Sequence, residues 1–552
     1  MACRLPPGDD QLASLNASRA ERARPQGARA AIHLLASPLM LAAIVALAGS
    51  LRLAVYLADR SLIIDESFMA LNVARRSATG LTGQLDWNTA APIAFLEIEK
   101  GLTALFGSSD FVLRLAPLAA SLVAVFLFVE LAKRVLESYA VALAALLFAG
   151  VALATAYAAI AKPYSFDLAF VIGIFLATLA VLQSEDANWP TLSLAGLGVV
   201  GPFFSYASVF AIAASGAVIV LDAVVHDSRA KRLRTAAVVC SWLLLLGITF
   251  LVRSSTLSHI RHSLSNENGD SFTSVRNAGG AVRQVLGVSP YTNDLGAGFA
   301  FAAAAAAAVL ISVGIVSLFR VAWEKALLLT LPAVFLVIAF AAGWYPLFPR
   351  AILFLAPSLV LFLAAGCAVL LESGRSTVVR GSVLALLALV VVSQGASTVR
   401  TLQSFRPDDG IKPIMNTLAE RQRPGDAVYL NFAAQYAFAH YLECDCAGSR
   451  VERAKRAGLW PVDPANGRVD QWSPALKSRS SRFRIGDFRG YDLRGIMQDF
   501  AELPRGRVWV ILAGPNSKQR RALVAQLDRR GKRIWARNND DVTAVSGYLY
   551  DF

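Results

Sequence analysis

The sequence predicts an α-helical protein that crosses a membrane many times and ends in a small α/β domain. Hydrophobic residues make up 56% of its 552 residues, charged residues only 17%, and the mean hydropathy is +0.51. A soluble domain is about 45–50% apolar and about 25% charged, so this composition excludes an ordinary soluble protein. The apolar residues form runs long enough to cross a bilayer, which takes about 20 helical residues. From about Thr401 the composition becomes that of a soluble domain.

Basic residues outnumber acidic ones and are unevenly distributed. The chain has 53 Lys and Arg against 39 Asp and Glu, a net charge of +14. The basic residues recur in short clusters between apolar runs, the pattern that the positive-inside rule predicts for cytoplasmic loops. This distribution favours membrane topology over nucleic-acid binding as the reason for the charge, so no nucleic-acid partner is expected.

The cysteines do not predict a disulfide framework, because they are few and scattered: Cys3, Cys240, Cys367, Cys444 and Cys446. Cys444 and Cys446 form a C-D-C motif, which lacks the spacing of a zinc knuckle. A metal site there is therefore the less favoured interpretation.

We expect about eleven spans. Residues 1–30 form a cytoplasmic segment, and the apolar run 31–58 is longer than the roughly 7–15 residues of a signal-peptide core, so it is expected to stay as the first span. Basic clusters such as Lys133–Arg134 place alternate loops inside, which leaves the loop 59–110 and residues 401–552 outside. The break within 191–225 is expected at Gly201-Pro202. The other spans are expected near 111–132, 138–160, 165–183, twice within 191–225, and near 236–252, 296–319, 326–343, 351–371 and 382–398.

The segment 401–552 has the pattern of an α/β domain. Strands are expected at Asp426–Phe432, Arg507–Leu512, 533–535 and 547–550, and a helix at Asn516–Arg530. Two interpretations of its many arginines stay open: a surface for anionic lipid heads or a polyanionic glycan, and a solvated basic surface.

The loop 59–110 carries the acidic pair around which a site is expected. Asp65 and Glu66 directly follow the first span. Ionised groups at that depth are costly unless they face water, a cation or a substrate. The expected topology places Lys162 and Arg350 at span ends on the same side. The sequence therefore predicts a charged cluster at one face of the membrane.

Four segments, in this order and spacing, carry a resemblance to a known family: D-E-S after the first span, LDWNTAAPIAFLEIEKGLTALFGSSDFVLRLAPL, AKPYSFDLAF and YPLFPRAILFLAP. The chain resembles the bacterial lipid-linked-sugar glycosyltransferases of the GT-C fold, relatives of the protein O-mannosyltransferases and of the aminoarabinose transferase that modifies lipid A. The resemblance covers roughly residues 31–400, and the ending GYLYDF is similar to the tail of one branch. It implies a GT-C fold with surface helices near Glu66–Ser77 and Ala91–Phe106.

The resemblance also implies a reaction. A sugar would pass from a polyprenyl-phosphate donor to a lipid, glycan or protein acceptor at the outer face of the bacterial inner membrane, among membrane lipids. Asp65 is expected to be the base that deprotonates the acceptor, with Glu66 as a neighbouring catalytic carboxylate. The alternative is that Asp65 only pairs with a cation such as Arg350. Lys162 and Arg350 are expected to bind the lipid phosphate and stabilise the charge that develops on it.

Asp86 and Asn88 are expected to touch either the sugar or a divalent ion, or neither. Many relatives carry a histidine or lysine before paired prolines here, whereas this chain has Asn88-Thr89-Ala90-Ala91-Pro92. This departure prevents a metal from being carried over. No cofactor is certain, and a divalent metal ion stays open.

Three further substrate-binding candidates have open roles. Tyr164 and Tyr345 either donate hydrogen bonds to substrate or anchor the chain at the membrane interface, and the interface role is favoured. Asp167 either faces Lys162 or caps or packs a helix.

Two other classes of protein were considered. A transporter or flippase of a lipid-linked precursor would be favoured by charges inside spans and by internal repeats, and neither is expected here. A structural scaffold would leave the shared side of Asp65, Asp86, Lys162 and Arg350 unexplained.

Overall fold

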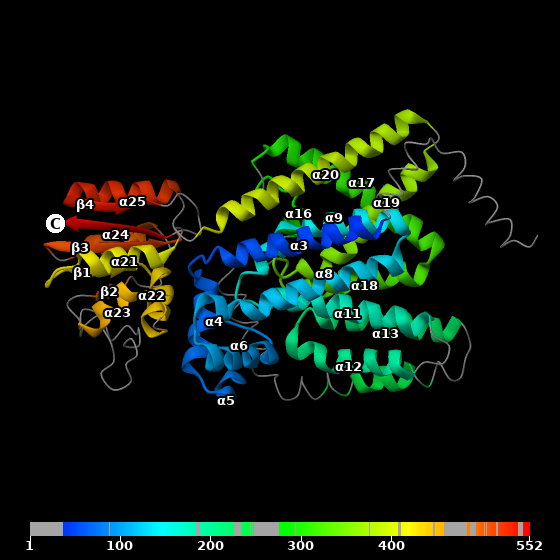
Figure 1. The fold of residues 1–552 in the computed structure, drawn as a ribbon, viewed down its shortest axis with the longest axis horizontal. Coiled ribbons are helices and arrows are strands. Elements are labelled where there is room, and N and C mark those ends of the chain that lie inside the picture. The colour runs from blue at the N-terminus through cyan, green and yellow to red at the C-terminus, as the bar shows by residue number, and fades with distance from the viewer. Residues whose placement is uncertain are drawn as a thin grey trace, which may run out of the picture.

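The computed structural model has a helical body and a smaller sheet domain, and the long helix α20 (Thr377–Ser404) runs from one toward the other (Figure 1). Of the expected span 236–252, residues 236–242, 244 and 247 are described, and the others lie outside the described residues. These residues are 37–87, 89–183, 188–225, scattered positions within 233–247, 275–292, 294–374, 376–406, 410–444, 446, 448–457, 483–485, 493–501, 503, 505–514, 517–538 and 545–552.

Within these ranges, eight helical segments are long and apolar enough to cross a membrane. Each coincides with an expected span, which confirms the polytopic helical class. The segments are Pro38–Leu57 (α3), Asp110–Val135 (α7, Asp110–Leu113, with α8, Leu115–Val135), Tyr164–Gln183 (α11), Ser208–Val225 (α13), Ala297–Val321 (α17), Trp323–Ala341 (α18), Leu353–Ser373 (η1, Leu353–Leu355, with α19, Ala356–Ser373) and α20. The total of about eleven stays a prediction.

Two expected spans differ from the prediction. Residues 138–160 form two short helices, α9 (Ser138–Ala149) and α10 (Ala152–Tyr157). Gly150 lies between them, and a Cβ there would come within 2.9 Å of the Gln394 side chain of α20, so glycine permits this close approach. The break expected at Gly201-Pro202 was wrong: α12 (Asn188–Phe204) continues through Pro202. A proline costs one backbone hydrogen bond, a loss that membrane helices tolerate, and the chain turns after Phe204 instead.

Small residues bring the helices of the body together. A Cβ on Gly314 of α17 would lie 1.9 Å from the Phe362 carbonyl oxygen, and one on Gly366 of α19 would lie 1.9 Å from that of Leu310. The two backbones therefore touch, as is typical of small-residue packing between membrane helices. The alanine-rich part of α17 belongs to the same contact, because Ala303, Ala306 and Ala307 are buried.

Three short helices form the loop that follows α3: α4 (Ile64–Arg75), α5 (Ala78–Leu81) and α6 (Ile93–Phe106). The helices expected near Glu66–Ser77 and Ala91–Phe106 are thus confirmed within two residues. They lie at the end of the helical body that faces the sheet domain (Figure 1). Their position places Asp65 and Glu66 between the two parts of the molecule.

The sheet domain has five strands in the order β2-β1-β3-β5-β4. Strands β2, β1 and β3 are parallel, while β5 is antiparallel to both of its neighbours. The expected strands and the helix α25 are confirmed, whereas β2 and α21–α24 were not predicted. The bounds are α21 (Ile411–Arg421), β1 (Ala427–Leu430), α22 (Ala434–Glu443), α23 (Ser449–Arg456), β2 (Phe483–Ile485), α24 (Leu493–Ala501), β3 (Arg507–Ala513), α25 (Ser517–Arg530), β4 (Lys532–Arg537) and β5 (Val545–Asp551).

Helices cover both faces of this sheet. Val428 and Leu430 pack with residues of α21 and α22, and Tyr429 packs with residues of α24 and α25. Because alternate side chains of β1 are buried on opposite faces, the strand is apolar throughout, as is typical of a sheet covered on both sides. The face with α21 and α22 also contacts the helical body, since its apolar cluster includes Leu62 and Leu113.

Candidate functional site

Asp65 lies at the start of α4 and faces a cation from a distant part of the chain. Its Oδ2 atom is 3.0 Å from Nη1 of Arg350, in the segment between α18 and η1. Both side chains are partly exposed, at 33% for Asp65 and 44% for Arg350. An ion pair that solvent reaches contributes little to stability and exchanges partners easily. The pair is therefore accessible to a charged ligand.

Two tyrosines position the Arg350 side chain. Its guanidinium donates hydrogen bonds to the hydroxyl groups of Tyr157 and Tyr164, whose ring centroids are 4.7 Å apart. The third tyrosine, Tyr345, donates to the carbonyl oxygen of Ala351 at 3.1 Å, next to Arg350 in the chain. Tyr164 and Tyr345 thus both support Arg350, although the interface role had been favoured for them.

Lys162 brings a second cation to the same place. It interacts electrostatically with both Asp65 and Arg350. Burial lowers the pKa of the Lys162 ammonium, the attraction of Asp65 opposes this effect, and the repulsion of Arg350 adds to it. Two cations thus face one carboxylate, an excess of positive charge that suits a phosphate group.

Glu66 occupies a different environment from Asp65 and is fully buried. Its two oxygens accept hydrogen bonds from Nε and Nη2 of Arg114 at 2.9 and 3.0 Å. They also accept from the backbone N–H groups of Ile63 and Ala161 at 3.1 and 3.0 Å. Burial alone would raise the pKa of the Glu66 carboxyl, but Arg114 and the other donors hold it below its ordinary value. Four donors thus occupy the Glu66 carboxylate, which favours a supporting role over the expected catalytic one.

The structure does not bring Asp86 to the Asp65 cluster. The Asp86 carboxylate pairs with Arg76 at 2.7 Å, and its backbone N–H donates to the Asn72 side chain at 2.9 Å. Asn72 follows Asp65 by seven residues in α4, a rise of about 10 Å. A sugar or metal contact shared by Asp86 and Asp65 is therefore not supported. Asn88 lies outside the described residues.

Asp167 is a packing residue in this structure. It is buried and accepts a hydrogen bond of 2.6 Å from Ser205 Oγ, in the turn between α12 and α13. The backbone N–H of Ala207 is a second donor to the same carboxylate. Asp167 therefore joins α11 to that turn, which favours the packing alternative over a contact with Lys162.

Sequence reasoning missed two residues that build the site, Tyr157 and Arg114, and a buried charge elsewhere in the spans, Arg52. Arg114 and Arg52 lie within spans, are almost fully buried, and contradict the expectation that span interiors carry no charge. Arg52 Nε donates to Ser121 Oγ at 2.9 Å, so it joins α3 to α8. The available signal was the rarity of arginine in an apolar run, which indicates a buried partner.

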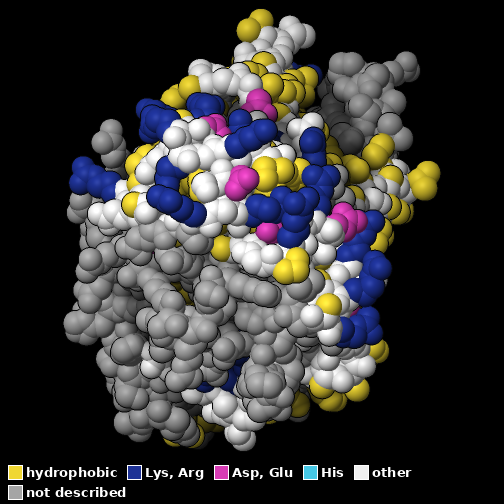
Figure 2. Space-filling view, turned by 90° about the vertical axis from the view of Figure 1, so that its left-hand side faces the viewer, with side chains coloured by type: hydrophobic (Ala, Val, Ile, Leu, Met, Phe, Trp, Pro, Cys, Tyr) yellow, Lys and Arg dark blue, Asp and Glu magenta, His cyan; other side chains and the backbone are white. Residues whose placement is uncertain are grey.

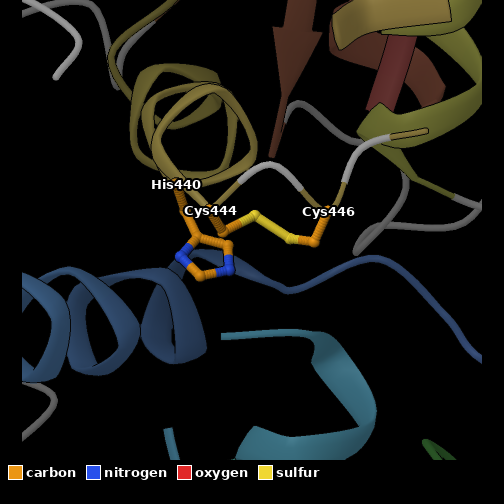
Figure 3. A group of neighbouring side chains, drawn as sticks. All are labelled: His440, Cys444 and Cys446. Carbon is orange, nitrogen blue, oxygen red and sulfur yellow. A yellow bond between two sulfur atoms is a disulfide. The ribbon is translucent and has the colours of Figure 1, made fainter. Parts of the chain in front are cut away.

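Cys444 and Cys446 form a disulfide, although the cysteines had not suggested one. Figure 3 shows this bond at the end of α22, beside the ring of His440. Among the described residues, these three form the one group of potential metal ligands, with the ligand atoms within 4.8 Å of one another. Zinc is bound by thiolates, and a disulfide offers none. The bonded pair therefore does not fit a zinc centre.

The sheet domain has a basic end. Figure 2 shows Lys and Arg side chains gathered on the face that points away from the helical body, where they outnumber acidic ones among the described residues. Exposed basic residues of the domain include Arg505, Arg529, Arg530, Lys532 and Arg533. Both interpretations of this surface, an anion-binding face and a solvated one, remain open.

The fold and the cluster define a polytopic membrane protein with charged residues gathered at one end of its spans. Residues 91–257 match the family model described as dolichyl-phosphate-mannose-protein mannosyltransferase. No curated protein has a matching sequence.

One solved structure gives the fold, and a second is more distantly similar. The crystal structure of ArnT from Cupriavidus metallidurans bound to undecaprenyl phosphate is similar, with 14% identity, a TM-score of 0.50, and coverage of 92% of this chain and 97% of that one. The archaeal oligosaccharyltransferase AglB from Archaeoglobus fulgidus, in complex with an inhibitory peptide and a dolichol-phosphate, matches at 10% identity and a TM-score of 0.42, over 85% of this chain and 69% of that one. The chain has the fold of ArnT, which confirms the expected GT-C fold.

Proposed function

We propose that this protein is a glycosyltransferase that moves a sugar from a polyprenyl-phosphate donor to a cell-envelope acceptor. The observation that carries the proposal is the cluster of Asp65, Lys162 and Arg350 at the ends of spans in a GT-C fold. A lipid tail can lie in the bilayer there while its phosphate reaches both cations. The undecaprenyl phosphate bound to ArnT and the dolichol-phosphate in complex with AglB support a donor of this class.

The chemistry follows from the charges. Lys162 and Arg350 bind the donor phosphate and stabilise the negative charge that it gains when the bond between the sugar and the phosphate breaks. Asp65 accepts the proton of the acceptor group as the new glycosidic bond forms. Without a donor, Arg350 forms an ion pair with Asp65. A donor phosphate that binds Arg350 in place of Asp65 therefore also leaves Asp65 free to act as the base.

Glu66 then has a supporting role. Through Arg114 and the backbone of Ala161 it fixes α4 to the segment that carries Lys162. We infer that Glu66 keeps Asp65 and Lys162 at a constant separation. The donor phosphate can therefore be bound by Lys162 and Arg350 beside the base Asp65, although the three residues come from distant segments of the chain.

The proposal includes a location. We place the cluster at the outer face of a bacterial inner membrane, with residues 1–30 in the cytoplasm and residues 401–552 outside. The basic clusters between spans support this orientation. Reporter fusions at Gly80 and Gly467 test it, and a cytoplasmic signal at either position would contradict it.

The decisive experiment replaces Asp65 with asparagine, which keeps the shape but removes the base. Transfer should fall by about 10²-fold or more while the protein still accumulates in the membrane. Mass spectrometry of membrane glycolipids and exported glycans, in a deletion strain complemented with each variant, measures the product. Asp294→Asn is the matched control, because Asp294 is an exposed acid that also pairs with an arginine, Arg400. Normal product from the Asp65→Asn strain would refute the assignment.

A further inference from the structure

The outer loop and the sheet domain meet in a seam, which we define as the contact between residues 59–113 and residues 411–446. One apolar cluster crosses it, and this cluster contains Leu62 and Ala70 on one side and Leu442 on the other. Tyr441 of α22 adds polar links, because its hydroxyl accepts from the Leu62 N–H at 2.7 Å and donates to Asp110 Oδ2 at 2.7 Å. The seam therefore fixes α4, the helix whose second residue is Asp65.

The disulfide lies within this seam. Cys444 is the residue that caps the C-terminal end of α22, and Cys446 Sγ lies 3.7 Å from the carbonyl oxygen of Ser108, between α6 and α7. Both cysteines are half-buried and pack against the apolar cluster of the seam. A bond at this place connects the end of α22 with the surface that it presents to the outer loop.

The bond is poorly suited to a purely stabilising role. Its cysteines are two residues apart. A disulfide stabilises a fold mainly by restricting the unfolded chain, and the restriction grows with the length of the closed loop. A bond that closes so short a loop restricts the unfolded chain very little. Its main effect is on the local conformation at the end of α22.

His440 gives the reduced state an advantage. The residue is 1% exposed, and its Nε2 atom has no hydrogen-bond partner among the described residues. One of its ring nitrogens lies within 4.8 Å of both sulfurs. Burial lowers the pKa of the imidazole, with a smaller effect of Lys412 in the same direction, against the opposing charges of Asp110, Glu443 and Glu66. A thiol can donate a hydrogen bond to a neutral imidazole, whereas a disulfide sulfur has no hydrogen to donate.

We propose that Cys444 and Cys446 are a thiol–disulfide exchange site whose redox state controls how firmly the sheet domain holds α4. The partner is a reductant that supplies two thiols. It is either a pair of small-molecule thiols or a protein of the thiol–disulfide oxidoreductase class. A donor thiolate attacks one sulfur, the bond between Cys444 and Cys446 breaks, and a mixed disulfide forms. The second donor thiolate then releases it, so the donor becomes a disulfide and the two cysteines each gain a hydrogen.

Reduction changes the seam because the sulfurs of two thiols repel each other at the length of a disulfide bond. Reduction separates the sulfurs, which displaces Cys446 from Ser108 or Cys444 from the end of α22. Tyr441 lies one turn before that end, so its hydrogen bond with Leu62 weakens. The inference goes beyond the proposed transfer reaction and holds whichever sugar is moved.

The first test measures exchange in the full-length protein purified in detergent with a chelator. The protein is equilibrated with glutathione redox buffers, quenched with acid and alkylated, and the peptide that carries both cysteines is quantified by mass spectrometry. We expect substantial reduction in buffers that leave structural disulfides oxidised. His440→Phe should shift the equilibrium toward the disulfide by about threefold to tenfold, the value of one hydrogen bond. A pair that stays oxidised throughout would overturn the proposal.

The second test asks whether the seam responds, and it needs no sugar donor. Hydrogen exchange at the Leu62 amide should be about tenfold faster or more after reduction, and equally fast without reductant in a Cys444→Ser/Cys446→Ser double variant. Cys240→Ser is the matched control, since Cys240 is a free, exposed cysteine of the helical body. Unchanged hydrogen exchange at the Leu62 amide in the reduced protein and in the double variant would refute the coupling. This result is independent of the proposed transfer reaction, which the Asp65→Asn variant tests.

Discussion

Asp65 and Glu66 are neighbours in the chain, and each is paired with an arginine, yet their surroundings differ. Glu66 and Arg114 are buried and joined by two hydrogen bonds, with backbone donors completing the carboxylate. Asp65 and Arg350 are joined by one contact of 3.0 Å and are partly exposed. Removing one partner from a buried pair leaves an uncompensated charge, whereas an exposed pair can be replaced by water or by a ligand.

Because of this difference in burial, the two carboxylates have different roles. A buried pair fixes geometry, since each partner depends on the other. An exposed pair stays available for exchange, since either partner can change its contact at little cost. Residues next to each other in sequence therefore serve stability in one case and, as we propose, chemistry in the other.

The largest expected effect is on stability, from Glu66→Gln. The variant leaves Arg114 buried without a counter-charge and should lose about 3–5 kcal/mol of folding free energy. Thermal unfolding in detergent measures this loss, with Asp65→Asn as the matched control and little change expected there. Because the folded-state pKa of Glu66 is lowered, its stabilisation is present above its unfolded pKa of about 4.3 and is lost as the pH falls through the folded pKa. Equal losses in the two variants would contradict the comparison.

The next effect is on donor binding. Arg350→Gln and Lys162→Gln should each weaken binding of a polyprenyl phosphate to the purified protein by about 1.5–3 kcal/mol, the value of one charge-assisted contact. Arg350→Lys should remain impaired, because a point charge does not replace a planar fork. Arg521→Gln, an exposed arginine of the sheet domain, is the control. Unchanged affinity in both the Arg350→Gln and Lys162→Gln variants would exclude the phosphate site.

A smaller effect is expected from Tyr157→Phe, which removes one hydrogen bond to Arg350. Donor affinity should fall by about 0.5–1.5 kcal/mol, while the melting temperature changes little. Tyr291→Phe is the control, since Tyr291 is 78% exposed. If Tyr157→Phe and Tyr291→Phe bind the donor equally well, Tyr157 does not position Arg350.

The smallest effect is expected from Glu99→Gln. Glu99 lies in α6, is fully buried, and neither of its oxygens has a partner among the described residues. Burial raises its pKa well above the ordinary value, so Glu99 lowers stability as the pH rises above its unfolded pKa. Glutamine does not titrate, so the variant should gain up to about 1 kcal/mol near neutral pH and nothing below pH 4. Glu97→Gln, partly exposed on the same helix, is the matched control, and an equal gain in the two variants would contradict an effect of burial.

Much of the architecture could be predicted because the sequence patterns that indicate it are local. Apolar runs mark the spans, and the alternation of basic clusters gives the side on which Asp65, Lys162 and Arg350 meet. Asp86 was grouped with them on the same ground, but it contacts Asn72, seven residues further along α4 than Asp65. Sharing a side of the membrane is a weaker condition than sharing a site.

The partners of buried charges were harder to predict. Arg114 could be recognised as unusual within an apolar run, but nothing in sequence distance connects it with Glu66, 48 residues earlier. The disulfide was missed because five scattered cysteines did not indicate a disulfide framework, whereas the bond joins residues two apart. In both cases the folded chain, and not the local pattern, decides the pairing.

The length of α20 bears on how an acceptor reaches the site. Its 28 residues extend about 42 Å, whereas the hydrocarbon core of a bilayer is about 30 Å thick. The helix therefore exceeds the hydrocarbon core by about 12 Å, so its polar ends extend beyond the apolar layer of the bilayer. If the protein transfers a sugar as we propose, the apolar length of α20 and its neighbours sets the depth at which the Asp65 cluster meets the bilayer, and thereby which part of a lipid-linked donor can reach it.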